Sequence, residues 1–188
     1  MSAAISGNQC ETVPDVAALI RAAIVAEVMN QISPARLSEF LADAKRKTYA
    51  GLDDDATVLT PLLPGSKQLE YRAGDLSYRD IYFGMRFFVG QETVQAGADV
   101  IWSMSYAGGV AAAVVDRGEF LSIYAFLRQA LLAIRDDRPF RGLPQFENES
   151  FRYVNTSSGD VAEFHGEEQI HRAGIKVYGL RYGGGLLR

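Results

Sequence analysis

Residues 88–109 read FVGQETVQAGADVIWSMSYAGG, and residues 164–185 read FHGEEQIHRAGIKVYGLRYGGG. The two stretches align without a gap, and the matched positions include Phe88 with Phe164, Glu92 with Glu168, and Tyr106 with Tyr182. A repeat inside a chain sets the architecture of the fold, so it is the first feature to interpret. Here it predicts a β-hairpin that occurs twice.

Alternation with a period of two assigns the residues of each hairpin strand to one of two faces. Glu92 in the first stretch and Glu168 in the second share a face with apolar neighbours such as Phe88 and Phe164. A carboxylate on a buried face must find hydrogen-bond partners or stay protonated, since burying a bare charge is very unfavourable. These two acids are therefore the most informative residues in the sequence.

Two helices are predicted before the two hairpins. Ser33 and Pro34 fit an N-cap and a first helical residue, and apolar positions at helical spacing follow. The run 45–47, Lys-Arg-Lys, suits the C-terminal end of that helix, where we expect it to be solvated. Helical spacing over residues 120–134 predicts the second helix.

Strand-like segments at 69–83 and 146–156 precede the two hairpins. The sequence thus predicts an α+β fold, in which a helix plus a three-stranded antiparallel meander occurs twice and forms one curved sheet packed by helices. We expect a single domain over 34–188, built of repeats 34–117 and 118–188. A tail and a lead helix, the latter over 14–32, precede it in residues 1–33.

Composition narrows the class of protein. The 188 residues are 48% hydrophobic and 22% charged, which is typical of one globular domain. The net charge is −4 and no basic stripe is visible, so we expect no direct contact with nucleic acid. No apolar run is long enough to span a membrane, and the N-terminus lacks the pattern of a signal peptide. We therefore expect a cytoplasmic protein.

Strand alternation also gathers aromatic and acidic residues as candidates for one ligand-binding sheet face. A carboxylate among aromatic rings suits a cationic or amine-bearing ligand, through charge pairing and cation–π contact. The same residues fit a polar core network in which tyrosine hydroxyls bind the two glutamates, and both interpretations stay open here. The candidates are Tyr78, Asp80, Tyr82, Glu92, Trp102, Tyr106, Glu168, Tyr178 and Tyr182.

One segment of the chain resembles a known bacterial family of domains of unknown function. The resemblance is specific in Tyr78-x-Asp80-x-Tyr82-Phe83-Gly84, Phe88-x-Gly90-Gln91-Glu92 and Trp102-x-Met104-x-Tyr106, and it covers roughly residues 36–186. Such domains often follow an Xre-type (lambda-repressor-like) helix-turn-helix, which implies a link to transcriptional regulation. Residues 1–35 are too short for that helix-turn-helix domain. The family has no established activity, so the resemblance implies no catalytic residue.

Three functional hypotheses follow. The first is a non-catalytic small-molecule-binding or sensing domain, with no catalytic residue, metal site or cofactor. The second is a hydrolase- or lyase-type enzyme that pairs Glu92 with Glu168, or Asp80 with Glu92, as general acid and base, although phosphate loops and nucleophile motifs are absent from the sequence. The third is an oligomerisation module whose helix 14–32 docks on a second copy to form a homodimer.

Overall fold

The computed structural model of the chain describes residues 32–50 and 57–187. The lead helix expected over 14–32 lies almost entirely outside the described residues. In chain order the elements are α2 (Pro34–Lys47), β1 (Lys67–Ala73), β2 (Leu76–Gly84), β3 (Phe87–Ala96), β4 (Asp99–Val110), α3 (Arg117–Leu132), β5 (Gln145–Glu147), β6 (Arg152–Asp160), β7 (Glu163–Arg172) and β8 (Ile175–Leu186).

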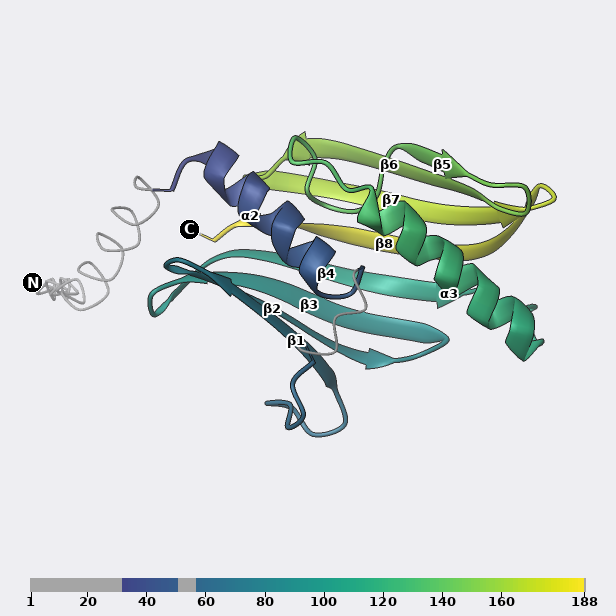
Figure 1. Cartoon of the computed structure of the whole chain (residues 1–188), viewed down its shortest axis with the longest axis horizontal. Coiled ribbons are helices and arrows are strands. Elements are labelled where there is room, and N and C mark those ends of the chain that lie inside the picture. Colours follow the sequence, from purple (N-terminus) through teal and green to yellow (C-terminus); the bar gives the residue numbers. More distant parts are fainter. Residues whose placement is uncertain (1–31, 51–56, 188) are drawn as a thin grey trace, which may run out of the picture.

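All eight strands belong to one sheet, with the order β1-β2-β3-β4-β8-β7-β6-β5. Every neighbouring pair is antiparallel, so β1–β4 form one meander and β5–β8 form another. The two meanders join only where β4 pairs with β8, with Tyr106 opposite Tyr182. Both helices lie on the same face of this sheet (Figure 1), and the core fills the space between helices and strands.

The fold is mainly β, and this corrects the α+β prediction. Strands contain 50% of the described residues and helices 20%. The expected repeating unit of one helix and three strands is wrong, because each half of the sheet contains four strands. Gly74, with φ 62°, turns the chain inside the segment 67–84 and divides it into β1 and β2. The short β5 adds a fourth strand to the second half by pairing with β6.

The first helix begins at Pro34, as the sequence predicted, whereas the second begins at Arg117, three residues before the predicted stretch 120–134. Ser33 Oγ accepts a hydrogen bond from the backbone N–H of Arg36 at 3.2 Å and so caps α2. Asp116 caps α3 by accepting a hydrogen bond from the N–H of Glu119 at 2.7 Å. Each helix then turns an apolar stripe toward the sheet. The buried apolar residues are Leu37, Phe40, Leu41, Ala42 and Ala44 in α2, and Phe120, Ile123, Phe126, Leu127, Ala130 and Leu131 in α3.

Two glycines allow a tyrosine ring to lie against the neighbouring strand. A Cβ on Gly90 would sit 2.3 Å from the hydroxyl oxygen of Tyr106, and a Cβ on Gly166 would sit 2.4 Å from the ring of Tyr182. Only glycine leaves room for such an approach. These glycines therefore fix the positions of two tyrosine hydroxyls on the helix-covered face of the sheet.

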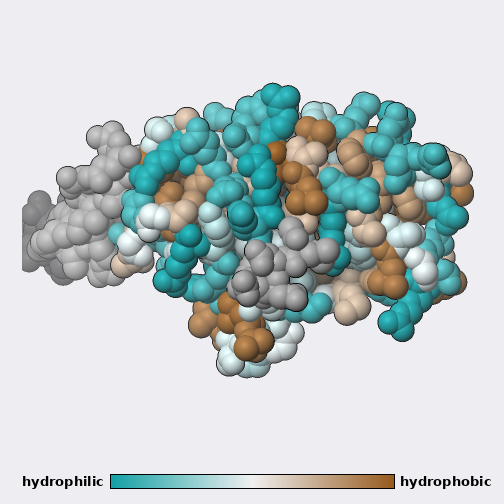
Figure 2. Space-filling view, in the orientation of Figure 1, coloured by the Kyte–Doolittle hydropathy of each residue, from teal (hydrophilic) through white to brown (hydrophobic). Residues whose placement is uncertain are grey.

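The surface on the helix side is largely hydrophilic, with separate hydrophobic areas (Figure 2). One such area is the loop before β1, where Leu59, Leu62 and Leu63 are exposed. Among the described residues, no helix is both long enough and apolar enough to cross a membrane.

Candidate functional site

Charged side chains are buried in the core between the helices and the sheet. Glu92 on β3 and Glu168 on β7 are both 0% exposed. Each is paired with a buried cation, Lys45 for Glu92 and Arg141 for Glu168. A buried ion is tolerated only when it is paired and hydrogen-bonded, so the two cations explain how the glutamates can be buried.

Lys45 reaches Glu92 from α2. Its Nζ lies 2.8 Å from Glu92 Oε2, donates to the carbonyl of Phe140 at 2.7 Å, and sits 5.7 Å from the ring centre of Trp102. The expectation that residues 45–47 form a solvated basic end is wrong for Lys45, which is fully buried. Burial lowers the pKa of Lys45, and the charge of Glu92 partly offsets this effect.

Glu168 has more partners than Glu92. Arg141 donates to Glu168 Oε1 at 2.6 Å, Tyr178 donates to the same oxygen at 2.8 Å, and Tyr153 donates to Oε2 at 2.7 Å. By contrast, Glu92 Oε1 accepts no hydrogen bond from the residues that the structure describes. The second half of the sheet thus holds a satisfied polar network, and the first half holds an incomplete one.

A third acid lies beside Glu92. Asp80 on β2 is opposite Glu92 in the strand register, and Asn155 on β6 is opposite Glu168 in the same way. Tyr106 donates to Asp80 Oδ1 at 2.6 Å, just as Tyr182 donates to Asn155 Oδ1 at 2.7 Å. Burial and then the charge of Glu92 raise the pKa of Asp80 to about 7.

Asp80 faces a cavity of about 300 Å³ between α3 and the β2–β4 part of the sheet, which we call the aromatic pocket. Buried residues form its floor, and exposed side chains stand at its mouth. Its lining residues include Asp80, Tyr106 and Arg141 at the floor, Tyr49, Tyr82, Phe88, Phe120, Tyr124 and Leu127 in the walls, and Lys67, Met85, Leu121 and Arg128 at the mouth.

The walls of the aromatic pocket are held in place by contacts among the rings. The ring centre of Phe88 lies 5.9 Å from that of Tyr106 and 6.4 Å from those of Tyr82 and Tyr124. Tyr124 is anchored from α3 by donating to the carbonyl of Met85 at 2.8 Å. Tilted and edge-to-face rings of this kind form a rigid apolar wall.

The structure brings three of the nine sequence-predicted residues into this pocket, namely Asp80, Tyr82 and Tyr106. The other six do not line it and are buried, although Tyr178 also borders a second hollow: Tyr78, Glu92, Trp102, Glu168, Tyr178 and Tyr182. The burial of Glu92 and Glu168 therefore fits the polar core network and not the ligand-binding face. Sequence reasoning missed Lys45 and Arg141, the cations on which the burial of both glutamates depends.

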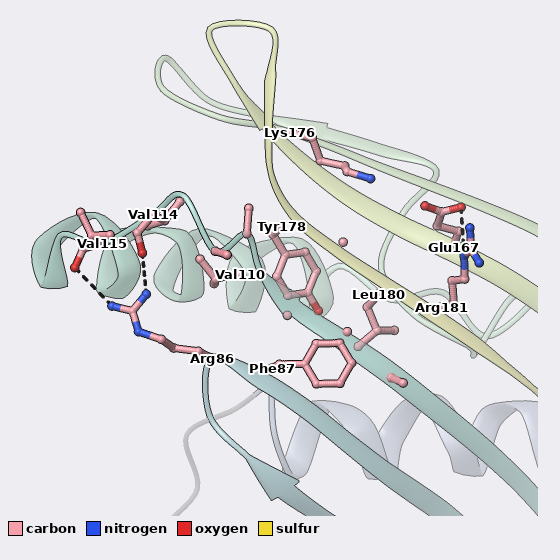
Figure 3. A pocket seen from close by; sticks show the side chains of 16 residues that line it. Arg86, Phe87, Val110, Val114, Val115, Glu167, Lys176, Tyr178, Leu180 and Arg181 are labelled. Atoms are coloured by element: carbon pink, nitrogen blue, oxygen red, sulfur yellow. Dashed lines mark hydrogen bonds and ion pairs between the residues drawn. The ribbon is translucent and has the colours of Figure 1, made fainter.

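A larger hollow of about 860 Å³ lies beside β4, β8 and the segment that leads into α3 (Figure 3). Three of its four charged side chains already have partners, and the fourth, Lys176, forms no ion pair with the residues that the structure describes. Arg86 donates to the carbonyls of Val114 at 2.5 Å and Val115 at 3.3 Å, and Arg181 lies 3.8 Å from Glu167. Because these partners leave few groups free to select a ligand, the aromatic pocket is the stronger candidate site.

Metal binding has no support in the described part of the chain, where no three His, Cys, Asp or Glu side chains lie together as ligands would. Two buried polar atoms near the floor of the aromatic pocket, Tyr49 Oη and Arg141 Nε, have no hydrogen-bond partner among the described residues. Such atoms can be satisfied by water or by a bound molecule.

A family described as "Domain of unknown function (DUF5680)" matches residues 80–187 of the chain. The match covers more than half of the 188 residues. The chain belongs to this family. No characterised protein and no solved structure is similar enough to the chain to count as a match.

The DUF5680 match begins at Asp80 and runs through β8. It includes the floor of the aromatic pocket and the α3 wall, whereas Lys45, Tyr49 and Lys67 lie outside it. The match concerns a domain of unknown function alone. A bacterial source and an adjacent helix-turn-helix therefore stay expectations from the resemblance.

Proposed function

We propose that this DUF5680 protein is a non-catalytic binding or sensing domain whose aromatic pocket takes a small molecule with a protonated amine and an apolar, preferably aromatic, body. The observation that carries the proposal is the charge balance of the core. Lys45 and Arg141 supply two cations, whereas Glu92, Glu168 and Asp80 supply three acids. Among the described residues, Asp80 is the one of these acids that forms no ion pair, and it is the one that lines the pocket.

The comparison of Asp80 with Asn155 supports this assignment. Both residues accept a hydrogen bond from a tyrosine two strands away in the same half of the sheet, and both lie opposite a buried glutamate. A neutral amide is sufficient for that structural role, as Asn155 demonstrates. A carboxylate at position 80 adds a negative charge that the fold itself does not need, and a ligand amine would compensate it.

The walls favour the same class of ligand. An ammonium group bound to Asp80 would lie among Tyr82, Phe88 and Tyr106, whose ring faces attract cations. A cavity of about 300 Å³ is at the small end of ligand-binding pockets. It therefore suits a compact molecule with one ring.

We propose no enzymatic function. Both acid pairs of the hydrolase or lyase hypothesis include Glu92, and neither Glu92 nor Glu168 lines the aromatic pocket, because buried cations hold both. An acid or base must reach the reacting group within hydrogen-bond distance. Dimerisation through helix 14–32 concerns residues outside the described part of the chain and stays a prediction from the sequence.

The proposal is tested by calorimetric titration at pH 8 with 4-methylbenzylamine and with the uncharged analogue 4-methylbenzyl alcohol. We expect the amine to bind at least about tenfold more tightly, because only the amine pairs with Asp80. Asp80→Asn should remove this difference and still fold, since Asn155 occupies the corresponding place in the other half.

Asp137→Asn is the matched control, because it removes an exposed carboxylate that does not line the pocket and should leave both affinities unchanged. Equal binding of amine and alcohol by the native protein would refute the proposal. So would an Asp80→Asn variant that still prefers the amine.

A further inference from the structure

The mouth of the aromatic pocket carries two cations, whereas its floor holds Asp80 and Arg141, and the charge of Arg141 is balanced by Glu168 at 2.6 Å. Lys67 begins β1, and its Nζ lies 5.8 Å from the ring centre of Tyr82. Arg128 reaches the same mouth from α3 and is exposed. Among the described residues neither cation forms an ion pair. Both cations can therefore pair with an anionic group of a ligand.

Tyr82 lies between the two charged ends of the pocket. Burial and then the charge of Asp80 raise the pKa of Tyr82, and Arg128 partly offsets the increase. The charge of Asp80 at the floor and the charge of Arg128 at the mouth therefore both act on the hydroxyl of Tyr82. Apart from Arg141, whose charge Glu168 balances, the pocket is dipolar along its depth, with the Asp80 carboxylate inside and two cations outside.

A ligand with a single charge meets one of these ends unfavourably. A purely cationic molecule would be attracted by Asp80 and repelled by Lys67 and Arg128, whereas a purely anionic molecule would experience the reverse. A molecule with both charges, placed at opposite ends of an apolar body, satisfies the floor and the mouth together.

On the basis of the proposed function, we infer that the ligand is a zwitterion whose amine binds Asp80 and whose carboxylate lies between Lys67 and Arg128 at the mouth. The amine and the carboxylate are on opposite ends of the molecule, with the ring or chain between them against Tyr82 and Phe88. An α-amino acid with both groups on one carbon does not fit this arrangement, because its two charges cannot reach the floor and the mouth simultaneously.

The test compares three probes that share one ring and one amine: 4-(aminomethyl)benzoate, its methyl ester, and 4-methylbenzylamine. The benzoate adds a carboxylate at the far end, and the ester masks it. We expect calorimetric titration at pH 8 to show about fivefold to twentyfold tighter binding of the benzoate than of either other probe. The gain should shrink in high salt, because the mouth is exposed to solvent.

The double variant Lys67→Gln/Arg128→Gln should lose the benzoate's advantage and bind 4-methylbenzylamine at least as well as the native protein. Both side chains are exposed, so the variant should fold. Arg117→Gln is the matched control, because Arg117 is also exposed on α3 but does not line the pocket. It should retain the full advantage.

Equal affinity for the three probes in the native protein, or an advantage that survives in the double variant, would overturn the zwitterion inference. If amine binding still depends on Asp80 in that case, the proposed function stands without it. If no amine binds at all, the proposed function fails and the inference fails with it.

Discussion

Asp80 shows how a single side chain can be assigned a role by comparison within one molecule. Asn155 makes the same contact with a tyrosine and lies at the same place in the strand register, yet it carries no charge. The contact therefore explains the hydrogen-bonding capacity of position 80 but not its acidity. The hydrogen bond from Tyr106 needs an acceptor at position 80 but not a charged one, so the carboxylate of Asp80 needs a functional reason.

The titration of Asp80 makes stability depend on pH. Its pKa is raised from 3.8 to about 7, so between these values the folded protein holds a proton that the unfolded chain has released. The contribution of Asp80 to the free energy of unfolding therefore falls as pH rises through this window and stays low above it. Asp80→Asn should become more stable than the native protein by about 2–4 kcal/mol between pH 4.5 and pH 8.

Urea denaturation of both proteins across this pH range measures the difference. A gap between Asp80→Asn and native protein that stays constant with pH would show that Asp80 has an ordinary pKa in the folded state. The decrease in stability should also be smaller when 4-methylbenzylamine is present, because the bound amine favours the ionised acid.

At the scale of the element, the sequence predicted the acids of the core but not the cations. Period-two alternation applies to one strand at a time, so it identified Glu92 and Glu168 and allowed tyrosine partners on other strands, but it named no partner from a helix or a loop. Lys45 did leave a signal, since Leu37, Leu41 and Lys45 recur every four residues and so share the buried stripe of α2. Arg141 follows α3 in a segment without periodicity, and its burial could not be predicted.

The pairing of α2 with the sheet through Lys45 predicts a specific pattern of stability. Lys45→Met leaves Glu92 buried without its cation and should cost about 3–5 kcal/mol of unfolding free energy. Adding Glu92→Leu removes the unpaired charge and should recover most of that loss. Chemical denaturation of the single and double variants measures both effects.

The exposed pair Arg135–Asp137 provides the control. Its carboxylate is 60% exposed, so Asp137→Asn should change stability by less than about 1 kcal/mol. If Lys45→Met cost as little as this surface substitution, the buried pair would not be what holds α2 on the sheet.

At the scale of the whole molecule, the fold depends on the pair formed by β4 and β8. Helix positions could be predicted from caps and apolar spacing, but the strand count could not, because turns such as Gly74 divide segments that look continuous in the sequence. The α+β prediction failed for that reason. The sheet becomes one unit only because β4 and β8 approach closely enough for ladder hydrogen bonds, and glycines line that approach.

Gly184 and Gly183 are neighbours on β8 that should respond differently to the same change. A Cβ on Gly184 would lie 2.0 Å from the carbonyl oxygen of Ser103 and 2.7 Å from the Cα of Met104, both in the backbone of β4. A Cβ on Gly183 would have its nearest neighbour, the carbonyl oxygen of Phe164, at 3.3 Å. Gly184→Ala must therefore push the two halves of the sheet apart, whereas Gly183→Ala needs only a small adjustment.

We expect Gly184→Ala to lower the free energy of unfolding by about 1–3 kcal/mol or more, and Gly183→Ala to change it by less than about 1 kcal/mol. Guanidinium denaturation measures both, and amide hydrogen exchange should show faster opening at β4 and β8 in Gly184→Ala than elsewhere in the sheet. Equal stability of the two variants would mean that the halves can separate at this pair without cost. In that case their union would depend on the helices that lie across both of them.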